Sequence, residues 1–268
     1  MPLKTAPLAA RPLILAHRGA SAEAPENTLA AFELAMRQGA DGIECDVRLS
    51  ADGAPVVIHD ARLDRTTSGR GRVDRHTTQE LRRLDAGSRF CRRHPALAKD
   101  RYRGAKIPLL AEAMDWVGQH GCLAYVEIKR ERADLPRLEE QVLQAVNAAG
   151  ARTRVTLISF HLPTLRRLRV LDGGIALGLD CTRPLLAIRR AQSVRAAVVL
   201  PHGTFVSRRF IERAHRAGLR VVPWGAHSPR AWQRLLALGA DGIIGNRPAL
   251  MRRTAALAGE WRTAEDAL

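Results

Sequence analysis

Short apolar runs alternate along this chain with longer amphipathic stretches, and this alternation restricts the fold more than any other feature. Nine short runs combine apolar and β-branched residues between breakers, which predicts β-strands. These runs span residues 13–16, 42–47, 55–58, 123–128, 154–159, 175–179, 197–200, 219–223 and 241–244. Strands that alternate with helices along a chain pair in parallel, so the pattern predicts an α/β protein with a parallel sheet.

Helix-like periodicity fills most of the intervals between these runs. In residues 28–38, Leu29, Phe32 and Met36 fall on one face, and Asn27 precedes them as an expected N-cap. The same reasoning predicts helices over residues 135–147, 163–170, 184–192, 207–217 and 229–238. Three of these helices begin at or near a proline, which the first helical position tolerates.

The number of units favours a closed barrel. When residues 55–58 are taken as an extension of the second unit, eight strands remain in 268 residues. This count predicts a (β/α)8 TIM barrel that forms one domain over residues 1–268. A doubly wound open sheet is the competing fold. Its dinucleotide-binding version is unsupported, because no Gly-x-Gly-x-x-Gly follows any predicted strand.

Residues 60–107 interrupt the alternation. This segment is charged, rich in glycine and only weakly periodic. A structureless loop of such length is uncommon within a compact domain. We therefore expect a small inserted subdomain after the second strand, placed over one end of the barrel.

The chain is strongly basic, which favours anionic partners. It has 43 lysines and arginines against 27 acidic residues, for a net charge of +16. Such a field attracts phosphorylated molecules and polyanions. The alternative to a binding surface for such anions is an arginine-rich surface that only contacts solvent. We favour this alternative because the arginines are spread along the chain. The sequence has no recognisable nucleic-acid-binding motif and few aromatic residues, so we expect no nucleic-acid partner.

The cysteines and the N-terminal region bear on location. The four cysteines are Cys45, Cys91, Cys122 and Cys181. None forms a Cys-x-x-Cys pair, which indicates buried thiols in a reducing compartment. The N-terminal region lacks the features of a signal peptide, and no apolar run is long enough to span a bilayer. We therefore expect a cytoplasmic protein without stable membrane insertion; its oligomeric state stays open.

Polar residues gather at the C-terminal ends of the predicted strands. In a barrel these ends form one rim, where active sites occur. The residues at or just beyond these ends are His17, Arg18, Glu44, Asp46, His59, Asp60, Glu127, Lys129, Ser159, His161, His202, Trp224 and Asn246.

Three carboxylates at this rim suggest a metal site. Glu44 and Asp46 are two residues apart on one strand, so both side chains point the same way. Glu127 on the neighbouring strand supplies a third. One such carboxylate would simply pair with a barrel arginine. Three together in an apolar region favour neutralisation by a cation, and oxygen ligands favour Mg²⁺ or Ca²⁺.

Two histidines and two cations complete the chemistry expected at the rim. His17 and His59 flank the carboxylate pair in sequence, and two imidazoles can divide the roles of general acid and base. Arg18 and Lys129 can hold phosphate oxygens. The alternatives are structural hydrogen bonds for the histidines, a surface ion pair for Arg18 and a salt bridge with Glu127 for Lys129.

These residues also lie in a series of short motifs that resembles a known family, the glycerophosphodiester phosphodiesterases. The motifs that carry the resemblance are His17-Arg18-Gly19, Pro25-Glu26-Asn27-Thr28, Glu44-Cys45-Asp46-Val47, His59-Asp60 and Leu63-Asp64-Arg65-Thr66-Thr67. Further matches extend the resemblance over residues 13–250, through 84–88, 107–108, 127–129 and Trp224. Any one motif alone is weak, whereas five in the family's order are specific.

The resemblance implies hydrolysis of glycerophosphodiesters, the deacylated phospholipids, to sn-glycerol 3-phosphate and an alcohol. It implies a barrel with a small insertion and a divalent metal on Glu44, Asp46 and Glu127. The implied acid/base pair is His17 and His59. Arg18 and Lys129 would lie near the phosphate, with Trp224 along the glycerol pocket. Glu26 would support the His17–Arg18 turn, and Asn27 would be a metal neighbour or a helix cap.

Two departures from the family pattern concern the glycerol end of the rim. Gly225-Ala226-His227 stands where a Thr-Val-Asn-like stretch is usual, and Gly245-Asn246-Arg247-Pro248 stands where a Thr-Asp-x-Pro-like motif is common. They leave the identity of the leaving alcohol open. The alternatives are a lysophospholipase D, which acts on a diester with an acyl chain, and a non-catalytic barrel that binds phosphate esters. The sequence also leaves open which histidine is the acid.

Overall fold

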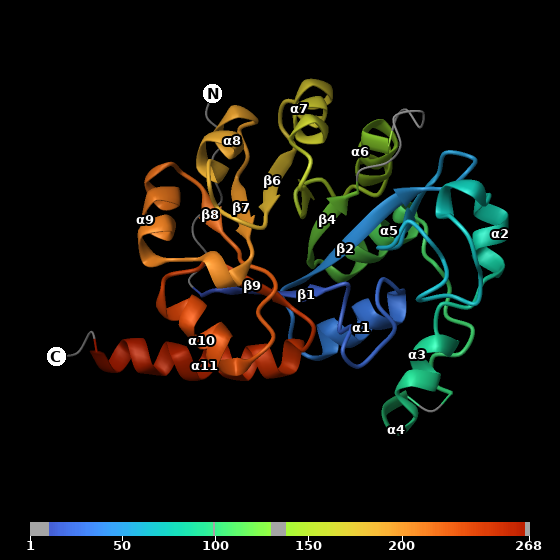
Figure 1. The fold of residues 1–268 in the computed structure, drawn as a ribbon, viewed down its shortest axis with the longest axis horizontal. Helices are drawn as coiled ribbons and strands as arrows, with labels where there is room; N and C mark the ends of the chain where they lie inside the picture. The colour runs from blue at the N-terminus through green and yellow to red at the C-terminus, as the bar shows by residue number, and fades with distance from the viewer. Residues whose placement is uncertain (1–10, 99, 130–137, 266–268) are drawn as a thin grey trace.

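The fold is a nearly closed barrel of eight parallel strands (Figure 1). The computed structural model describes residues 11–98, 100–129 and 138–265. Neighbouring strands follow the order β8-β7-β6-β5-β4-β2-β1-β9. The barrel strands are β1 (Leu13–His17), β2 (Gly42–Leu49), β4 (Leu123–Ile128), β5 (Val155–Ser159), β6 (Ala176–Cys181), β7 (Val198–Pro201), β8 (Arg220–Val221) and β9 (Gly242–Gly245).

Backbone hydrogen bonds join the two outermost strands of this order. The amide of Asp241 donates to the carbonyl of Val221 at 2.9 Å, and Ile244 donates to Pro223 at 2.9 Å. The ninth strand, β3 (Pro55–Val57), pairs antiparallel with the end of β2 and lies outside the ring. The predicted (β/α)8 barrel is therefore confirmed, and residues 55–58 extend the second unit as expected.

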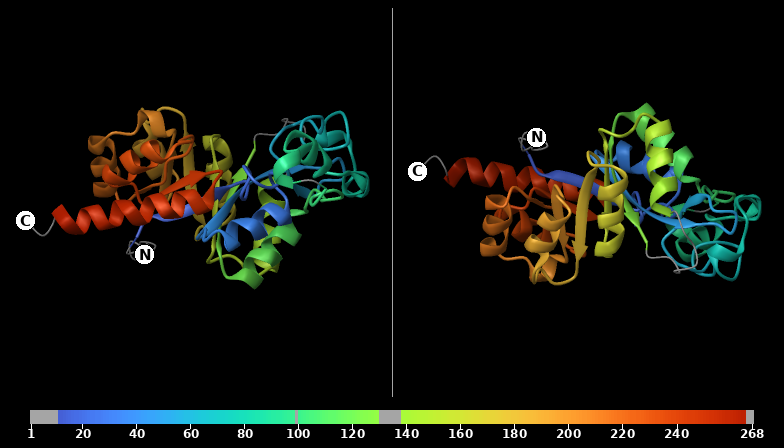
Figure 2. Two further views of the ribbon diagram at one scale, coloured as in Figure 1. Left: turned by 90° about the horizontal axis from the view of Figure 1, so that it is seen from below. Right: turned by 90° about the horizontal axis from the view of Figure 1, so that it is seen from above.

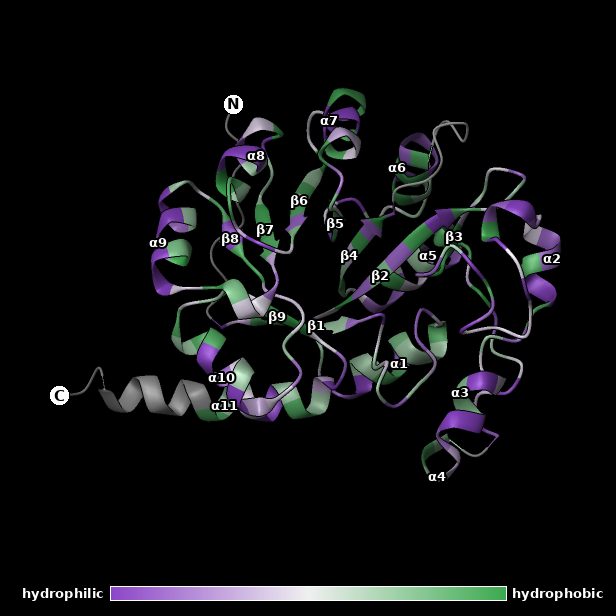
Figure 3. Ribbon diagram, in the orientation of Figure 1, coloured by the Kyte–Doolittle hydropathy of each residue, from purple (hydrophilic) through white to green (hydrophobic). Residues whose placement is uncertain are grey.

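Side chains alternate between the barrel interior and the surrounding helices. On β9, Ile244 belongs to the interior cluster while its neighbour Ile243 packs in the outer one. The helices around the barrel (Figure 2) are α1 (Leu29–Arg37), α5 (Leu110–His120), α6 (Leu138–Ala148), α7 (Leu162–Leu171), α8 (Ala187–Ser193), α9 (Arg208–Arg216), α10 (Pro229–Ala237) and α11 (Pro248–Glu265). Figure 3 shows their mixed faces, for example on α9, where Ile211 and Ala214 are buried.

The segment between β3 and α5 lies beside the barrel (Figure 1). It contains the short helices η1 (Val73–Arg75), α2 (Thr78–Arg83), α3 (Ser88–Arg93) and α4 (Pro95–Ala98). Leu63, Val73 and Leu81 form a small core with Val56 and Ile58 at the end of β3. This segment therefore has a small hydrophobic core that it shares with residues at the end of β3. It follows the second unit of the barrel, where an insertion was expected.

Several predicted boundaries were wrong. Thr28, not Asn27, caps α1, because the Thr28 hydroxyl accepts a hydrogen bond from the Ala31 amide at 3.2 Å. Asn27 has a left-handed φ of 57° and its side chain turns to another partner. The strand predicted over 219–223 shortens to β8, and helices α5 and α11 were not predicted. The expected start of the helix over 135–147 lies partly outside the described residues.

Two further expectations concern thiols and membranes. All four cysteines are free; Cys45, Cys91 and Cys122 are buried, and Cys181 is partly exposed. Within the described ranges, none of the helices combines the length and the apolar character needed to cross a bilayer.

Gly42 offers a test of strand packing in the barrel. A Cβ at this position would lie 2.3 Å from the carbonyl oxygen of Leu123 on β4. We expect Gly42→Ala to lower the free energy of unfolding by about 1–3 kcal/mol, because strand backbones must move apart. Gly173→Ala is the control, since an added Cβ there meets no atom within 4 Å. Urea denaturation measures both, and equal stability of the two variants would contradict this view of the strand contact.

Candidate active site

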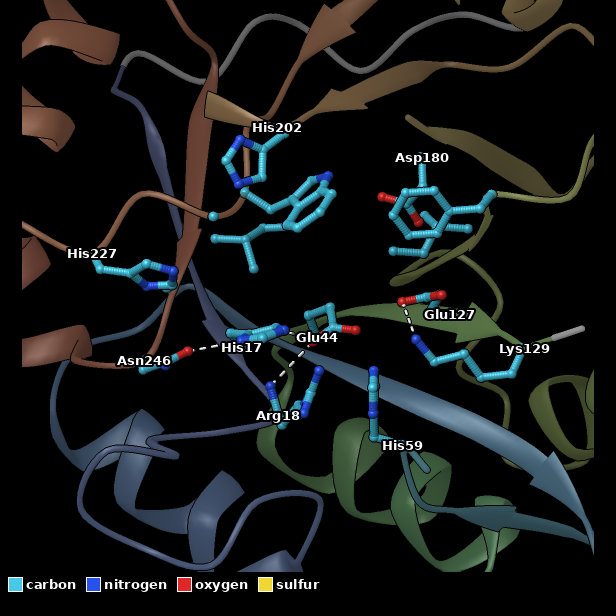
Figure 4. Close-up of a pocket in the computed structure, with 16 residues that line it drawn as sticks. His17, Arg18, Glu44, His59, Glu127, Lys129, Asp180, His202, His227 and Asn246 are labelled. Carbon is cyan, nitrogen blue, oxygen red and sulfur yellow. Dashed lines mark hydrogen bonds and ion pairs between the residues drawn. The ribbon is translucent and has the colours of Figure 1, made fainter. Parts of the chain in front are cut away.

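A cavity of about 360 Å³ opens at the C-terminal ends of the barrel strands (Figure 4). The predicted residues that line it are His17, Arg18, Glu44, His59, Glu127, Lys129 and Trp224. Asp46 lies directly beside this lining and is fully buried. The barrel thus brings every predicted site residue to one place.

The three carboxylates converge because of strand register. Asp46 on β2 pairs with Glu127 on β4, and Glu44 lies two residues earlier on the same face of β2. One oxygen from each of the three carboxylates lies within 4.8 Å of the others. These distances satisfy the geometric requirement for three ligands that share one ion.

Asp46 is compensated by cations from the protein. Lys129 Nζ lies 2.8 Å from Asp46 Oδ1 and 2.7 Å from Glu127 Oε2. Arg18 Nε lies 3.1 Å from Asp46 Oδ2. Burial raises the pKa of Asp46, but Lys129 and Arg18 outweigh it and hold the pKa below the usual range. Lys129 thus forms the salt bridge with Glu127 that was its expected alternative, whereas Arg18 pairs with the buried Asp46 and not only at the surface.

Glu44 is much less well compensated. Its Oε2 accepts a hydrogen bond from the backbone amide of Arg18 at 3.1 Å, and His17 Nε2 lies 3.9 Å away. Burial, followed by the negative charges of Asp46 and Glu127, raises the pKa of Glu44 well above its usual value. Burial also raises the pKa of Glu127, although Lys129 opposes this.

This donor set fits a hard divalent cation. Three carboxylate oxygens lie close enough to share an ion with metal–oxygen distances of about 2.0–2.6 Å. Two positive charges placed there would neutralise the repulsion that raises the pKa of Glu44. Among the described residues this group offers oxygen ligands and no sulfur or imidazole ligand.

Asn27 orients one of these carboxylates. Its side-chain Nδ2 donates to Asp46 Oδ2 at 2.8 Å, and its Oδ1 accepts from the Asp46 amide at 3.3 Å. Asn27 is therefore the neighbour of a proposed metal ligand, which was one of its two expected roles, and not a helix cap.

Arg18 is held by a network of charged residues that extends into the inserted segment. Glu26 accepts from Arg18 Nη1 at 2.8 Å, as expected for a residue that supports this turn. Arg65 donates to both oxygens of Glu26, at 2.6 and 2.7 Å. The same guanidinium donates from Nε to Asp60 Oδ2 at 2.5 Å. Arg65 thus links the Arg18 support to the residue that follows His59.

The two histidines have different partners. His17 Nδ1 lies 2.7 Å from Asn246 Oδ1, and His59 Nδ1 lies 2.6 Å from Asp60 Oδ1. Burial lowers the pKa of His17 to about 4, and the charge of Arg18 adds to this effect. Burial also lowers the pKa of His59, although Asp46 and Asp60 oppose it.

An aromatic wall faces the charged side of the cavity. The rings of Phe160 and Trp224 lie 5.6 Å apart, and those of His202 and Trp224 lie 4.8 Å apart. The indole N–H of Trp224 donates to the carbonyl of Leu200 at 3.0 Å. Trp224 therefore presents its ring, and not its N–H, to the cavity.

Sequence reasoning missed the role of Asp180 in this cavity. Asp180 lies near the end of β6 and lines the cavity, and burial followed by the charge of Glu127 raises its pKa well above the usual value. The predicted strand ended at residue 179, so the same signal that identified Asp46, an acid that ends an apolar strand, was overlooked.

The two departures from the family pattern both reach the cavity, through His227 and Asn246.

Two residues of the predicted rim have local structural contacts. The Ser159 hydroxyl donates to the carbonyl of Ile128 at 2.8 Å, and His161 Nδ1 lies 3.2 Å from the Thr164 hydroxyl. Neither residue is among those that line the cavity.

Comparison with known proteins identifies the family. The model of the glycerophosphoryl diester phosphodiesterase family matches residues 17–250. The chain belongs to this family. The resemblance inferred from the motifs is therefore confirmed, and so is the prediction that the chain is a phosphoric diester hydrolase.

Relatives of the chain span nearly its whole length. It is 35% identical over 237 residues to a glycerophosphodiester phosphodiesterase of Caldanaerobacter subterraneus subsp. tengcongensis, with coverage of 88% of this chain and 94% of that protein. A glycerophosphodiester phosphodiesterase of Bacillus subtilis is 32% identical, with coverage of 91% and 86%. The structure of an Oleispira antarctica phosphodiesterase in complex with the product sn-glycerol-3-phosphate is 30% identical and superposes with a TM-score of 0.80. That comparison covers 91% of this chain and 96% of the other.

The bridge formed by Arg65 predicts a change in acid stability. Burial raises the pKa of Asp60, but the hydrogen bonds from Arg65 and His59 outweigh it and lower the pKa to about 2. A carboxylate with a lowered pKa contributes stability above its unfolded pKa, and this contribution is lost as the pH falls toward the folded value. We expect Arg65→Gln to reduce the rise in unfolding free energy between about pH 2 and 4.

Urea denaturation at a series of pH values measures this slope. Arg82→Gln is the matched control, because Arg82 lies in the same segment but pairs with Glu112 and not with Asp60. If the unfolding free energy of both variants rises with pH as steeply as that of the original protein, this interpretation is wrong.

Proposed function

We propose that the chain hydrolyses glycerophosphodiesters to sn-glycerol 3-phosphate and an alcohol, with a divalent metal ion, Mg²⁺ or Ca²⁺, on Glu44, Asp46 and Glu127. The convergence of these three carboxylates within 4.8 Å, beside two histidines and two cations, is the observation on which the proposal rests. The product that the Oleispira antarctica relative binds supports the choice of substrate.

Arg18 and Lys129 are the groups that bind the phosphate. Arg18 is fixed by Glu26 and Asp46, and Lys129 by Asp46 and Glu127, so both cations are oriented before the substrate arrives. Preorganised cations stabilise the charge that develops on phosphate oxygens during the reaction. When bound, the metal would add further charge stabilisation as a Lewis acid.

His17 is the base in this proposal. When Asn246 Oδ1 accepts from Nδ1 of His17, the second ring nitrogen, Nε2, has a free lone pair. The lowered pKa of His17, about 4, keeps the imidazole neutral near pH 7. Its Nε2 removes the proton of the attacking hydroxyl, which belongs either to water or to C2 of the glycerol. In the second case the alcohol leaves with formation of a cyclic phosphodiester, which a water molecule then opens to glycerol 3-phosphate.

His59 is the acid. The Asp60 carboxylate accepts from its Nδ1 and stabilises the imidazolium form, and Arg65 fixes that carboxylate. Burial lowers the pKa of His59 in the enzyme without substrate. The negative charge of a bound phosphodiester would raise this pKa. Nε2 then donates its proton to the leaving oxygen of the alcohol.

A second candidate function, lysophospholipase D activity, follows from exposed apolar residues at the rim. Phe160, Leu185, Leu186 and Phe205 are exposed and follow strands β5 to β7. Phe160 also lines the cavity, so an acyl chain bound along these residues would continue from the catalytic site. Hydrolysis of lysophosphatidylcholine at a rate comparable to glycerophosphocholine would favour this function.

Removal of divalent metal tests the first part of the proposal. We expect dialysis against a chelator to abolish release of glycerol 3-phosphate from glycerophosphocholine, and Mg²⁺ or Ca²⁺ to restore it. Enzyme-coupled detection of glycerol 3-phosphate gives the rate. Full activity after exhaustive chelation would refute metal dependence, and no activity with any metal would favour the non-catalytic, phosphate-ester-binding barrel.

Substitution of the histidines tests the second part. Loss of a general acid or base lowers turnover by about 100- to 10,000-fold, so His17→Ala and His59→Ala should lower kcat far more than they change KM. His161→Ala is the control, since His161 lies at the same rim but outside the cavity lining. Near-normal turnover in both His17→Ala and His59→Ala would end the acid/base assignment.

A further inference from the structure

Asp180 is a buried acid in the cavity to which the proposed reaction assigns no role. Its relative exposure is 5%, and its carboxyl lines the cavity above Glu127 in the view of Figure 4. Its Oδ2 is buried and has no hydrogen-bond partner among the residues that the structure describes. A buried polar atom without a partner destabilises the free protein, so a ligand that bonds to it gains affinity.

The position of Asp180 separates it from the proposed metal site. It extends from β6, two strands beyond Glu127 on β4 in the order of the sheet. It is also not a member of the trio of carboxylates whose oxygens converge. Leu200 is its register partner on β7, and Ile158, Phe160 and Trp224 are the apolar and aromatic residues that line the same cavity.

We propose that Asp180 binds the terminal hydroxyl of the glycerol moiety, the one farther from phosphorus, and so selects glycerol diesters over diesters that lack this group. The inference rests on the proposed function, because the phosphate must lie between Arg18 and Lys129. A substrate held there extends away from the metal site toward β6. The glycerol carbons then pack against the aromatic wall, and the hydroxyl meets Oδ2 of Asp180, which has no partner among the described residues.

The depth of Asp180 identifies the part of the substrate that it contacts. It lies within the barrel, on the same strand face as Gly178, whose Cβ would meet Ile158, Val198 and Leu200 at 2.8 Å. A small polyol fits beside such a filled interior, whereas a variable headgroup requires the open side of the cavity. A site built to hydrogen-bond a hydroxyl also discriminates strongly against an analogue that lacks it.

The test compares two phosphodiesters that differ in one hydroxyl. Glycerophosphocholine has both glycerol hydroxyls, and 2-hydroxypropyl phosphocholine retains the C2 hydroxyl but lacks the terminal one. The ratio of their kcat/KM values is measured for the metal-loaded enzyme and for Asp180→Leu, an apolar replacement of similar size. Asp180→Ala, which also removes the hydrogen-bonding group, serves if the leucine variant does not fold.

We expect the original enzyme to prefer glycerophosphocholine by about 10- to 100-fold. In Asp180→Leu, kcat/KM for glycerophosphocholine should fall by this factor, while the value for the analogue stays within about twofold, so the preference disappears. Cys181→Ala is the control; Cys181 is the next residue on β6 and packs on the outer side of the barrel, so it should leave the ratio unchanged.

Other outcomes would overturn the inference. An equal loss on both substrates would mean that Asp180 acts through the structure or through the common phosphocholine group. An unchanged ratio in Asp180→Leu, or an original enzyme that does not discriminate, would also exclude hydroxyl binding by Asp180. If the original enzyme turns over neither diester, the proposed function itself is wrong, which distinguishes that failure from the loss of this inference alone.

Discussion

Repulsion among three carboxylates, two of them buried, is the interaction on which the rest of the site depends. Glu44, Asp46 and Glu127 converge because two parallel strands pair in register, and the low exposure of Glu44 and Asp46 prevents water from screening their charges. The protein supplies Arg18 and Lys129, which compensate Asp46 and part of Glu127. The charge that remains on Glu44 is what a divalent cation would neutralise.

The same charges organise residues well outside the carboxylate cluster. Arg18 requires a second partner, Glu26, which Arg65 from the inserted segment holds in place. Arg65 also fixes Asp60, and Asp60 binds His59. The inserted segment therefore takes part in the charged network of the site. It connects Arg18, which we propose binds the phosphate, to one of the two proposed proton-transfer groups through two carboxylates.

Much of this architecture was predictable from local sequence patterns. The alternation of apolar and amphipathic runs gave the barrel, and acids that end strands predicted Glu44, Asp46 and Glu127. Properties that depend on three-dimensional neighbours were not predictable. The pairing of Asn27 with Asp46 arises from a left-handed turn, so its polar side chain was interpreted as a cap. Asp180 escaped notice because strand ends are uncertain by one or two residues, and the predicted strand ended one residue before it.

The central claim is that the three carboxylates share one divalent ion, and anomalous diffraction from crystals soaked in Mn²⁺ tests it most directly. Mn²⁺ accepts the same oxygen ligands as Mg²⁺ and Ca²⁺ and can be located by its anomalous signal. The account predicts a single strong peak about 2.0–2.6 Å from oxygens of Glu44, Asp46 and Glu127. Crystals that bind no Mn²⁺ at this cluster, or bind it only elsewhere on the protein, would contradict the account.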